Sequence, residues 1–183
     1  MTVALFFGTF DPLHIGHVAI AGHVLNTCAV DALWFVLSPH NPHKAPDSIS
    51  DFALRASALK ATLAYYADPR LQLCEVENEL PRPSYTITTL ECLEQQYPDT
   101  RFAIVMGGDS LLMLPTWYRS ADIIARYPLW VYPRGDVQTI PSSLAGQGDI
   151  HILDAPLLHI SSTYIREGRR KGNNMRFFEA ARV

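Results

Sequence analysis

Six short apolar runs, most of them separated by helix-like segments, constrain the fold of this chain more than any other feature. The runs lie at residues 3–7, 33–37, 71–75, 102–106, 129–132 and 151–153. Strands that alternate with helices are typical of a parallel sheet with helices on both faces. We therefore predict an α/β fold with a doubly wound parallel sheet. A chain of 183 residues can bury a sizeable core without disulfides, so a single domain is expected.

Three longer helices are predicted between these strands. The first covers residues 16–29, where apolar side chains repeat at helical spacing, and the third covers residues 84–97 and ends before Pro98. The second begins at Asp51, with Ser50 or Asp51 as its cap. The apolar residues expected on one side of this second helix are Leu54, Ala58, Ala61 and Tyr65. Proline and polar residues make 38–50 and 134–148 loops.

Charge and cysteine content narrow the classes of partner. The formal net charge is −3, which argues against a general affinity for nucleic acid or for an acidic membrane. No apolar run approaches 18 residues, and the first residues lack the features of a signal peptide. Three widely spaced cysteines suggest a reducing compartment. We expect a cytoplasmic protein; a homo-oligomer is possible, and the sequence does not decide the oligomeric state.

The stretch GTFDPLHIGH, residues 8–17, follows the first predicted strand. In a doubly wound sheet, the loop after the first strand is the usual phosphate-binding loop. Gly8 and Gly16 allow backbone to approach a ligand, and a helix that starts at Gly16 offers free N–H groups to an anion. His14 and His17 would point at the same anion. The stretch is neither a P-loop nor a GxGxxG motif.

Two other interpretations of this stretch stay open at this point. Gly8 and Pro12 can simply form a turn, with both histidines as polar surface residues. Alternatively, a zinc site could be built from four histidines, His14, His17, His40 and His43. Against zinc, no cysteine is nearby and neither pair has the spacing of an HExxH motif.

A second stretch, ISSTYIR at residues 160–166, also has the features of an anion site. Ser161 or Ser162 can cap a short helix, and Arg166 would lie one turn further on the same side. An N-cap alone is the commoner reason for such a serine pair. Its combination with the histidine stretch favours a role in binding.

Together the two stretches resemble the HxGH and ISSTxIR signatures of the nucleotidylyltransferase superfamily. The resemblance implies a Rossmann-like nucleotidylyltransferase domain, residues 1–183, in which both motifs converge on a nucleoside triphosphate. Three further stretches, NPHK (41–44), PSYT (83–86) and MGGDSL (106–111) with PTWY (115–118), resemble bacterial nicotinate-nucleotide adenylyltransferases. Phosphopantetheine adenylyltransferases are similar, but usually carry Thr at the place of His14.

The resemblance implies adenylyl transfer from ATP to nicotinate mononucleotide, a step of NAD biosynthesis that yields nicotinate adenine dinucleotide and pyrophosphate. Mg²⁺ is expected to arrive with ATP, with no dedicated metal site on the protein. The catalytic residues would be His14, His17 and Arg166. The residues expected to bind ATP are Gly8, Thr9, Phe10, His14, Gly16, His17, Gly107, Asp109, Ile160, Ser161, Ser162 and Arg166. Those expected to bind nicotinate mononucleotide are Lys44, Tyr85, Thr86, Asp109, Trp117, Tyr118 and Arg134.

Some of these residues have simpler interpretations. Trp117 and Tyr118 could be core aromatics, Lys44 a solvated charge, and Asp109 a helix cap. The chain also departs from the family pattern at Phe7, where many members have a second glycine. Its tail lacks the usual Leu-Pro, which puts the packing of the carboxyl-terminal segment in doubt. A nucleotide sensor without turnover is the alternative function.

Overall fold

The computed structural model describes residues 1–39, 49–134, 137 and 139–180. Its strands form one six-stranded sheet in the order β3-β2-β1-β4-β5-β6, and all neighbouring strands are parallel. The strands are β1 (Thr2–Gly8), β2 (Ala32–Leu37), β3 (Leu71–Cys74), β4 (Arg101–Gly107), β5 (Leu129–Tyr132) and β6 (Ile150–Ile152). Each predicted run forms one of these strands, so the doubly wound parallel sheet is confirmed.

Most of the helices lie between strands, as predicted, and the last helix follows the final strand. The helices are α1 (Ile15–Thr27), α2 (Phe52–Tyr66), α3 (Thr86–Gln96), α4 (Gly108–Met113), α5 (Ser120–Arg126) and α6 (Ser162–Arg170). Short 3-10 turns are η2 (Val76–Asn78), η3 (Leu114–Thr116) and η4 (Arg176–Phe178). The three predicted longer helices are present, each shifted by one or two residues at its ends. None of the helices in the described part of the chain is long and apolar enough to cross a membrane.

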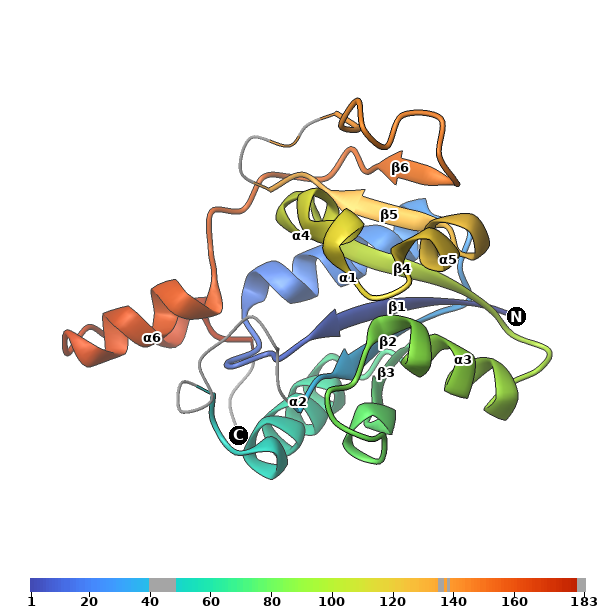
Figure 1. Cartoon of the computed structure of the whole chain (residues 1–183). Helices are drawn as coiled ribbons and strands as arrows, with labels where there is room; N and C mark the ends of the chain where they lie inside the picture. The colour runs from blue at the N-terminus through green and yellow to red at the C-terminus, as the bar shows by residue number, and fades with distance from the viewer. Residues whose placement is uncertain (40–48, 135–136, 138, 181–183) are drawn as a thin grey trace.

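Helices cover both faces of the sheet (Figure 1). Alternate residues of β1 belong to different cores: Val3 and Leu5 pack with α3 and α5, whereas Ala4 and Phe6 pack with α1 and α2. Successive side chains of a strand point to opposite faces, so a strand buried on both sides must be apolar throughout. This explains why the strand sequences are continuous apolar runs.

The apolar side predicted for α2 is not the side that the structure buries. Leu54 is 68% exposed and Tyr65 72% exposed, while the buried residues of this helix are Arg55, Ala56, Leu59 and Thr62. Alanine and leucine occur around most of α2, so helical spacing does not distinguish the packed side from the exposed side. The buried side includes a charged residue, which the apolar pattern could not indicate.

The chain changes direction across the sheet between β1 and β4. The segments from β1 to β3 extend to one side, and β4 then returns to the other side of β1. Ligands of open α/β sheets bind beyond the carboxyl ends of the strands at such a switch point. The strand ends here are Gly8 and Gly107, which places the predicted nucleotide site between two of its predicted residues.

Candidate active site

A cavity of about 290 Å³ lies at this switch point. Its lining comes from the ends of β1, β4 and β5, the start of α6, and the loop between β1 and α1. We call this loop, residues 9–14, the histidine loop. The predicted residues that line the cavity are Gly8, Thr9, Phe10, His14, His17, Gly107, Asp109, Trp117, Arg134, Ser161 and Ser162. Tertiary structure therefore gathers most of the expected nucleotide-binding residues, from opposite ends of the chain, around one cavity.

Other predicted residues lie around this cavity without lining it. Gly16 and Ile160 line a small adjoining hollow together with both histidines. A Cβ atom at Gly16 would come within 2.7 Å of Ile160 Cγ2. Only glycine therefore lets the first turn of α1 pack this closely against the segment that precedes α6. Lys44 lies outside the described residues.

The two histidines are stacked at the start of α1. Their ring centroids are 3.6 Å apart, and the backbone N–H of His14 donates to Nδ1 of His17 at 3.2 Å. A neutral imidazole has one donor and one acceptor nitrogen. Because Nδ1 of His17 accepts, its proton is on Nε2, and this ring lines the cavity. The capping contact thus sets the tautomer of the residue expected to act on the reacting phosphates.

His14 is a neutral side chain at physiological pH. Burial lowers the pKa of His14 from 6.5 to about 4, and the positive charge of Arg134 contributes to the same shift. The side chain is only 5% exposed, and Nδ1 has no hydrogen-bond partner among the described residues. An unsatisfied buried polar atom costs free energy, so its presence at a cavity indicates a place for a ligand atom.

The lowered pKa predicts a loss of stability in acid. An unfolded chain protonates His14 near pH 6.5, whereas the folded chain resists protonation until about pH 4, so acid favours the unfolded state. Relative to a His14→Gln variant, which cannot titrate, the wild type should lose about 2 kcal/mol between about pH 7.5 and 5.0. Urea unfolding of both proteins at each pH measures this. A stability difference that is independent of pH would contradict the assignment.

Helix α6 is bonded to the histidine loop. Ser161 caps the helix, since its Oγ accepts the N–H of Tyr164 at 3.1 Å, as one of the two predicted serines was expected to do. Ser162 Oγ donates to the carbonyl of Pro12 at 3.0 Å, and Arg166 Nη1 donates to the carbonyl of Asp11 at 2.6 Å. The two motifs therefore hold each other in place.

One buried nitrogen of Arg166, Nε, has no hydrogen-bond partner among the described residues. By contrast, Nη2 of Arg166 donates to Thr163 Oγ1 at 3.2 Å. Arg166 does not itself line the main cavity. Its position beneath the loop gives it a structural role in addition to the predicted contact with phosphate.

The carboxyl-terminal tail also packs on the histidine loop. Glu179 forms an isolated antiparallel bridge with His14, and the N–H of Ala180 donates to the carbonyl of Leu13 at 3.3 Å. Arg169 of α6 pairs with Glu179 at 2.7 Å. The unusual tail sequence put this packing in doubt, but the described residues of the tail do pack against the site.

Asp109 and Arg134 face each other across the cavity mouth. Asp109 lies in the first turn of α4 and accepts the N–H of Ser110, and its Oδ2 is 3.5 Å from Arg134 Nη1. Both side chains are about half exposed, so the pair contributes little to stability. Either group can exchange this partner for a substrate at small cost.

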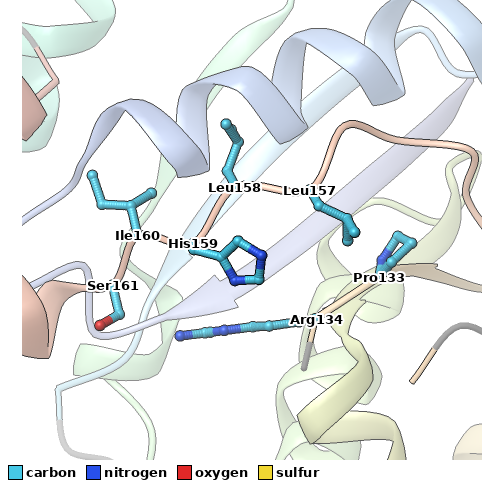
Figure 2. A pocket seen from close by; sticks show the side chains of 7 residues that line it. All are labelled: Pro133, Arg134, Leu157, Leu158, His159, Ile160 and Ser161. Carbon is cyan, nitrogen blue, oxygen red and sulfur yellow. The ribbon is translucent and has the colours of Figure 1, made fainter. Parts of the chain in front are cut away.

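A second hollow of about 270 Å³ opens beside the main cavity and shares Arg134 and Ser161 with it. Figure 2 shows Leu157 and Leu158 on the chain that leads to α6, with the ring of His159 turned toward the extended side chain of Arg134. The hollow combines an apolar wall with two flat polar groups. Sequence reasoning missed His159 because a lone histidine in a loop has no spacing to mark it.

Three aromatic residues expected to bind nicotinate mononucleotide lie near one another. Trp117 lines the cavity and packs partly on the core, while Tyr118 is 54% exposed. The rings of Tyr85 and Tyr118 are 4.7 Å apart, so the start of α3 and the turn after η3 lie side by side. Tyr85 is the N-cap of α3, so this motif lies at the start of the helix that the sequence predicted over residues 84–97.

The zinc alternative has no structural support in the described residues. His40 and His43 lie outside them. Within residues 1–39, 49–134, 137 and 139–180, no group of three or more His, Cys, Asp or Glu side chains is arranged to hold a metal ion.

Comparison with known proteins identifies the family. The Cytidylyltransferase-like family model matches residues 5–168. A probable nicotinate-nucleotide adenylyltransferase of Flavobacterium psychrophilum is 37% identical over 96% of this chain and 90% of its own length. One of Bacteroides fragilis is 36% identical over 95% of this chain and 85% of its own. This chain is a member of the nicotinate-nucleotide adenylyltransferase family.

A solved structure has the same fold. Nicotinic acid mononucleotide adenylyltransferase of Plasmodium falciparum, complexed with NaAD, matches with a TM-score of 0.78 at 17% identity. The match covers 96% of this chain and 87% of that one. The α/β, Rossmann-like architecture predicted from the motifs of this chain is therefore confirmed.

Proposed function

We propose that this protein transfers the adenylyl group of ATP to nicotinate mononucleotide, a step of NAD biosynthesis. An oxygen of the mononucleotide 5′-phosphate forms a bond to the α-phosphorus of ATP. The bond between that phosphorus and the oxygen bridging to the β-phosphate breaks, and pyrophosphate leaves. The product is nicotinate adenine dinucleotide. Membership in the adenylyltransferase family supports this proposal.

One structural observation carries the proposal: the histidine loop and α6 meet at the switch point of the sheet. Each brings a buried nitrogen, His14 Nδ1 and Arg166 Nε, that has no partner among the described residues. Phosphate oxygens are suitable partners for such atoms, and the capped start of α6 adds backbone N–H groups with a favourable dipole. The site is thus equipped for an extended anion such as a triphosphate.

The reaction needs no protein nucleophile, because the acceptor phosphate is already an anion. The enzyme must instead align two anions and stabilise the charge that develops on the leaving pyrophosphate. We assign His17 Nε2–H to the α-phosphate, and Ser161, Ser162 and Arg166 to the β- and γ-phosphates. A neutral His14 can contribute a hydrogen bond without a full charge.

A divalent metal ion accompanies ATP in this type of reaction, and we propose that it is Mg²⁺. Mg²⁺ usually keeps several waters and binds through one or two carboxylates plus substrate phosphates. Asp109 is the one carboxylate among the described residues of the cavity lining, which suits a metal carried mainly by the nucleotide. When bound, the ion would offset phosphate charge.

The hollow of Figure 2 is our candidate for the adenine ring. It adjoins Ser161, where the triphosphate is proposed to bind, and its wall of Leu157 and Leu158 can pack on a flat base. Arg134 lines this hollow as well as the main cavity, so it can contact either nucleotide. Its assignment to nicotinate mononucleotide alone remains a prediction.

Replacement of Trp117 should weaken binding of the mononucleotide selectively. We expect Trp117→Ala to raise KM for nicotinate mononucleotide at least about tenfold and to change KM for ATP little, since a stacked aromatic contributes about 1–3 kcal/mol. The matched control is Trp117→Phe, which retains an aromatic surface and should lose less. Initial-rate kinetics with each substrate varied measure this effect. An equal rise in both KM values would mean that Trp117 is a structural residue.

Release of pyrophosphate from ATP–magnesium tests the proposed activity directly. The acceptors are nicotinate mononucleotide, nicotinamide mononucleotide, phosphopantetheine and flavin mononucleotide. We expect release to be fastest with the first acceptor and to require it. Binding of ATP without release with any acceptor would favour the nucleotide sensor, and a preference for phosphopantetheine or flavin mononucleotide would move the protein to another branch of the superfamily.

A further inference from the structure

Arg55 is a buried charged side chain that the proposed reaction does not use. It lies on α2, is only 4% exposed, and does not line the cavity at the switch point. Burial lowers the pKa of its guanidinium, although the negative charges of Asp11 and Asp51 oppose the shift. A buried charge is costly unless it is fully hydrogen-bonded. Its position therefore calls for an explanation beyond packing.

The hydrogen bonds of Arg55 join three segments of backbone. Its Nη1 donates to the carbonyls of Thr9 at 2.7 Å and Ser38 at 2.9 Å, and Nη2 donates to that of Pro39 at 3.0 Å. Its Nε donates to the carbonyl of Ser50 at 2.9 Å. One planar group thus connects the loop after β1, the loop after β2 and the start of α2.

The bond to Thr9 lies next to a strained residue of the site. Phe10 has a φ of +45°, a left-handed conformation that is unfavourable for a bulky side chain, and it persists only where the surroundings hold it. The ring of Phe10 packs edge-on against His17, with centroids 5.1 Å apart. Arg55 is therefore linked to His17 indirectly: it bonds to Thr9, and the next residue, Phe10, packs on His17. Arg55 itself does not line the cavity.

We propose that Arg55 is a positioning residue: it holds the histidine loop in the conformation that aims His17 at the reacting phosphates. This inference rests on the proposed function. An Asp11–Ser50 contact supports the same link, because Asp11 Oδ2 accepts the N–H of Ser50 at 3.0 Å. Loss of the guanidinium should release the Phe10 conformation and misplace His17, and small misplacements cost large factors in rate.

The decisive test is rescue of an Arg55→Ala variant by guanidinium. A hollow of about 350 Å³ that Arg55 helps to line opens on this side of the loop, so a small cation has a route to the vacated place. We expect kcat to fall at least about tenfold with little change in KM for ATP. About 20 mM guanidinium chloride is far below the molar range that unfolds proteins, and it should raise kcat of Arg55→Ala at least about fivefold. Lys60→Ala is the control, because Lys60 lies on the exposed side of the same helix and its loss should leave kcat unchanged.

Two further measurements separate the possible failures. The ring nitrogens of His17, observed by NMR in the absence of substrate, should lose their single tautomer in Arg55→Ala, and this readout does not depend on the reaction. Should Arg55→Ala fail to fold, Arg55→Lys replaces it, with a similar fall in kcat expected because an ammonium cannot reach four carbonyls in one plane. An inactive wild type would refute the proposed function. An active wild type whose Arg55 variant keeps kcat and the His17 tautomer would refute the positioning role.

Discussion

Replacement of His17 by alanine is expected to lower kcat by about 10² or more while ATP binding stays nearly intact. The Nδ1 atom of His17 accepts the N–H of His14, so the Nε2 proton is available to the phosphates in the cavity. Loss of one positioned donor to charge that develops in the transition state costs a few kcal/mol. Steady-state kinetics together with equilibrium binding of ATP measure the two effects separately.

Two variants serve as controls for this expectation. His17→Gln places an amide nitrogen near the former Nε2 and should retain part of the rate. His23→Ala removes a histidine from the same helix α1 but outside the cavity lining, so its kcat should equal that of the wild type. If His17→Ala kept kcat and only raised KM for ATP, His17 would be a ground-state binding residue and our assignment would be wrong.

The second large effect that we expect is a substrate preference: kcat/KM should be at least about 10²-fold higher with nicotinate mononucleotide than with nicotinamide mononucleotide. Nicotinate mononucleotide carries a carboxylate on its pyridine ring, and nicotinamide mononucleotide carries an amide at the same place. Tyr85 is the N-cap residue of α3 and its ring centroid lies 4.7 Å from that of Tyr118, so the free N–H groups of the first turn of α3 lie beside the segment of Trp117 and Tyr118. A carboxylate accepts from these donors with both oxygens, whereas an amide presents NH₂ in place of one oxygen and leaves the donor that faces it unpaired.

A single backbone change can test the source of this preference. Thr86 is the first residue of α3, a position where proline fits a helix, and Tyr85 before it is extended, as a residue that precedes proline should be. Thr86→Pro therefore removes one N–H without breaking the helix, and it should reduce the preference. Thr86→Ala keeps the N–H and should preserve it. Equal efficiency of the wild type with both substrates would eliminate the backbone carboxylate pocket.

Much of the site could be predicted because its signals are local. The histidine stretch lies between a strand and a helix, and Ser161 caps α6 through a contact three residues away. Such features depend on short-range hydrogen bonding and on the allowed conformations of a few residues. The alternation of apolar runs likewise indicated both the strands and the two-sided burial of the sheet.

What the sequence by itself determined is therefore the six strands, the three longer helices, the motif positions and the membership of the family. Only the tertiary structure decided that Arg166 donates to the carbonyl of Asp11, 155 positions away, and that burial keeps His14 neutral. It also decided that α2 buries Arg55 and exposes Leu54. These properties depend on which distant segments pack together, because the pKa of a side chain and the choice of a helix face arise from its burial against those segments, which spacing along the chain does not reveal.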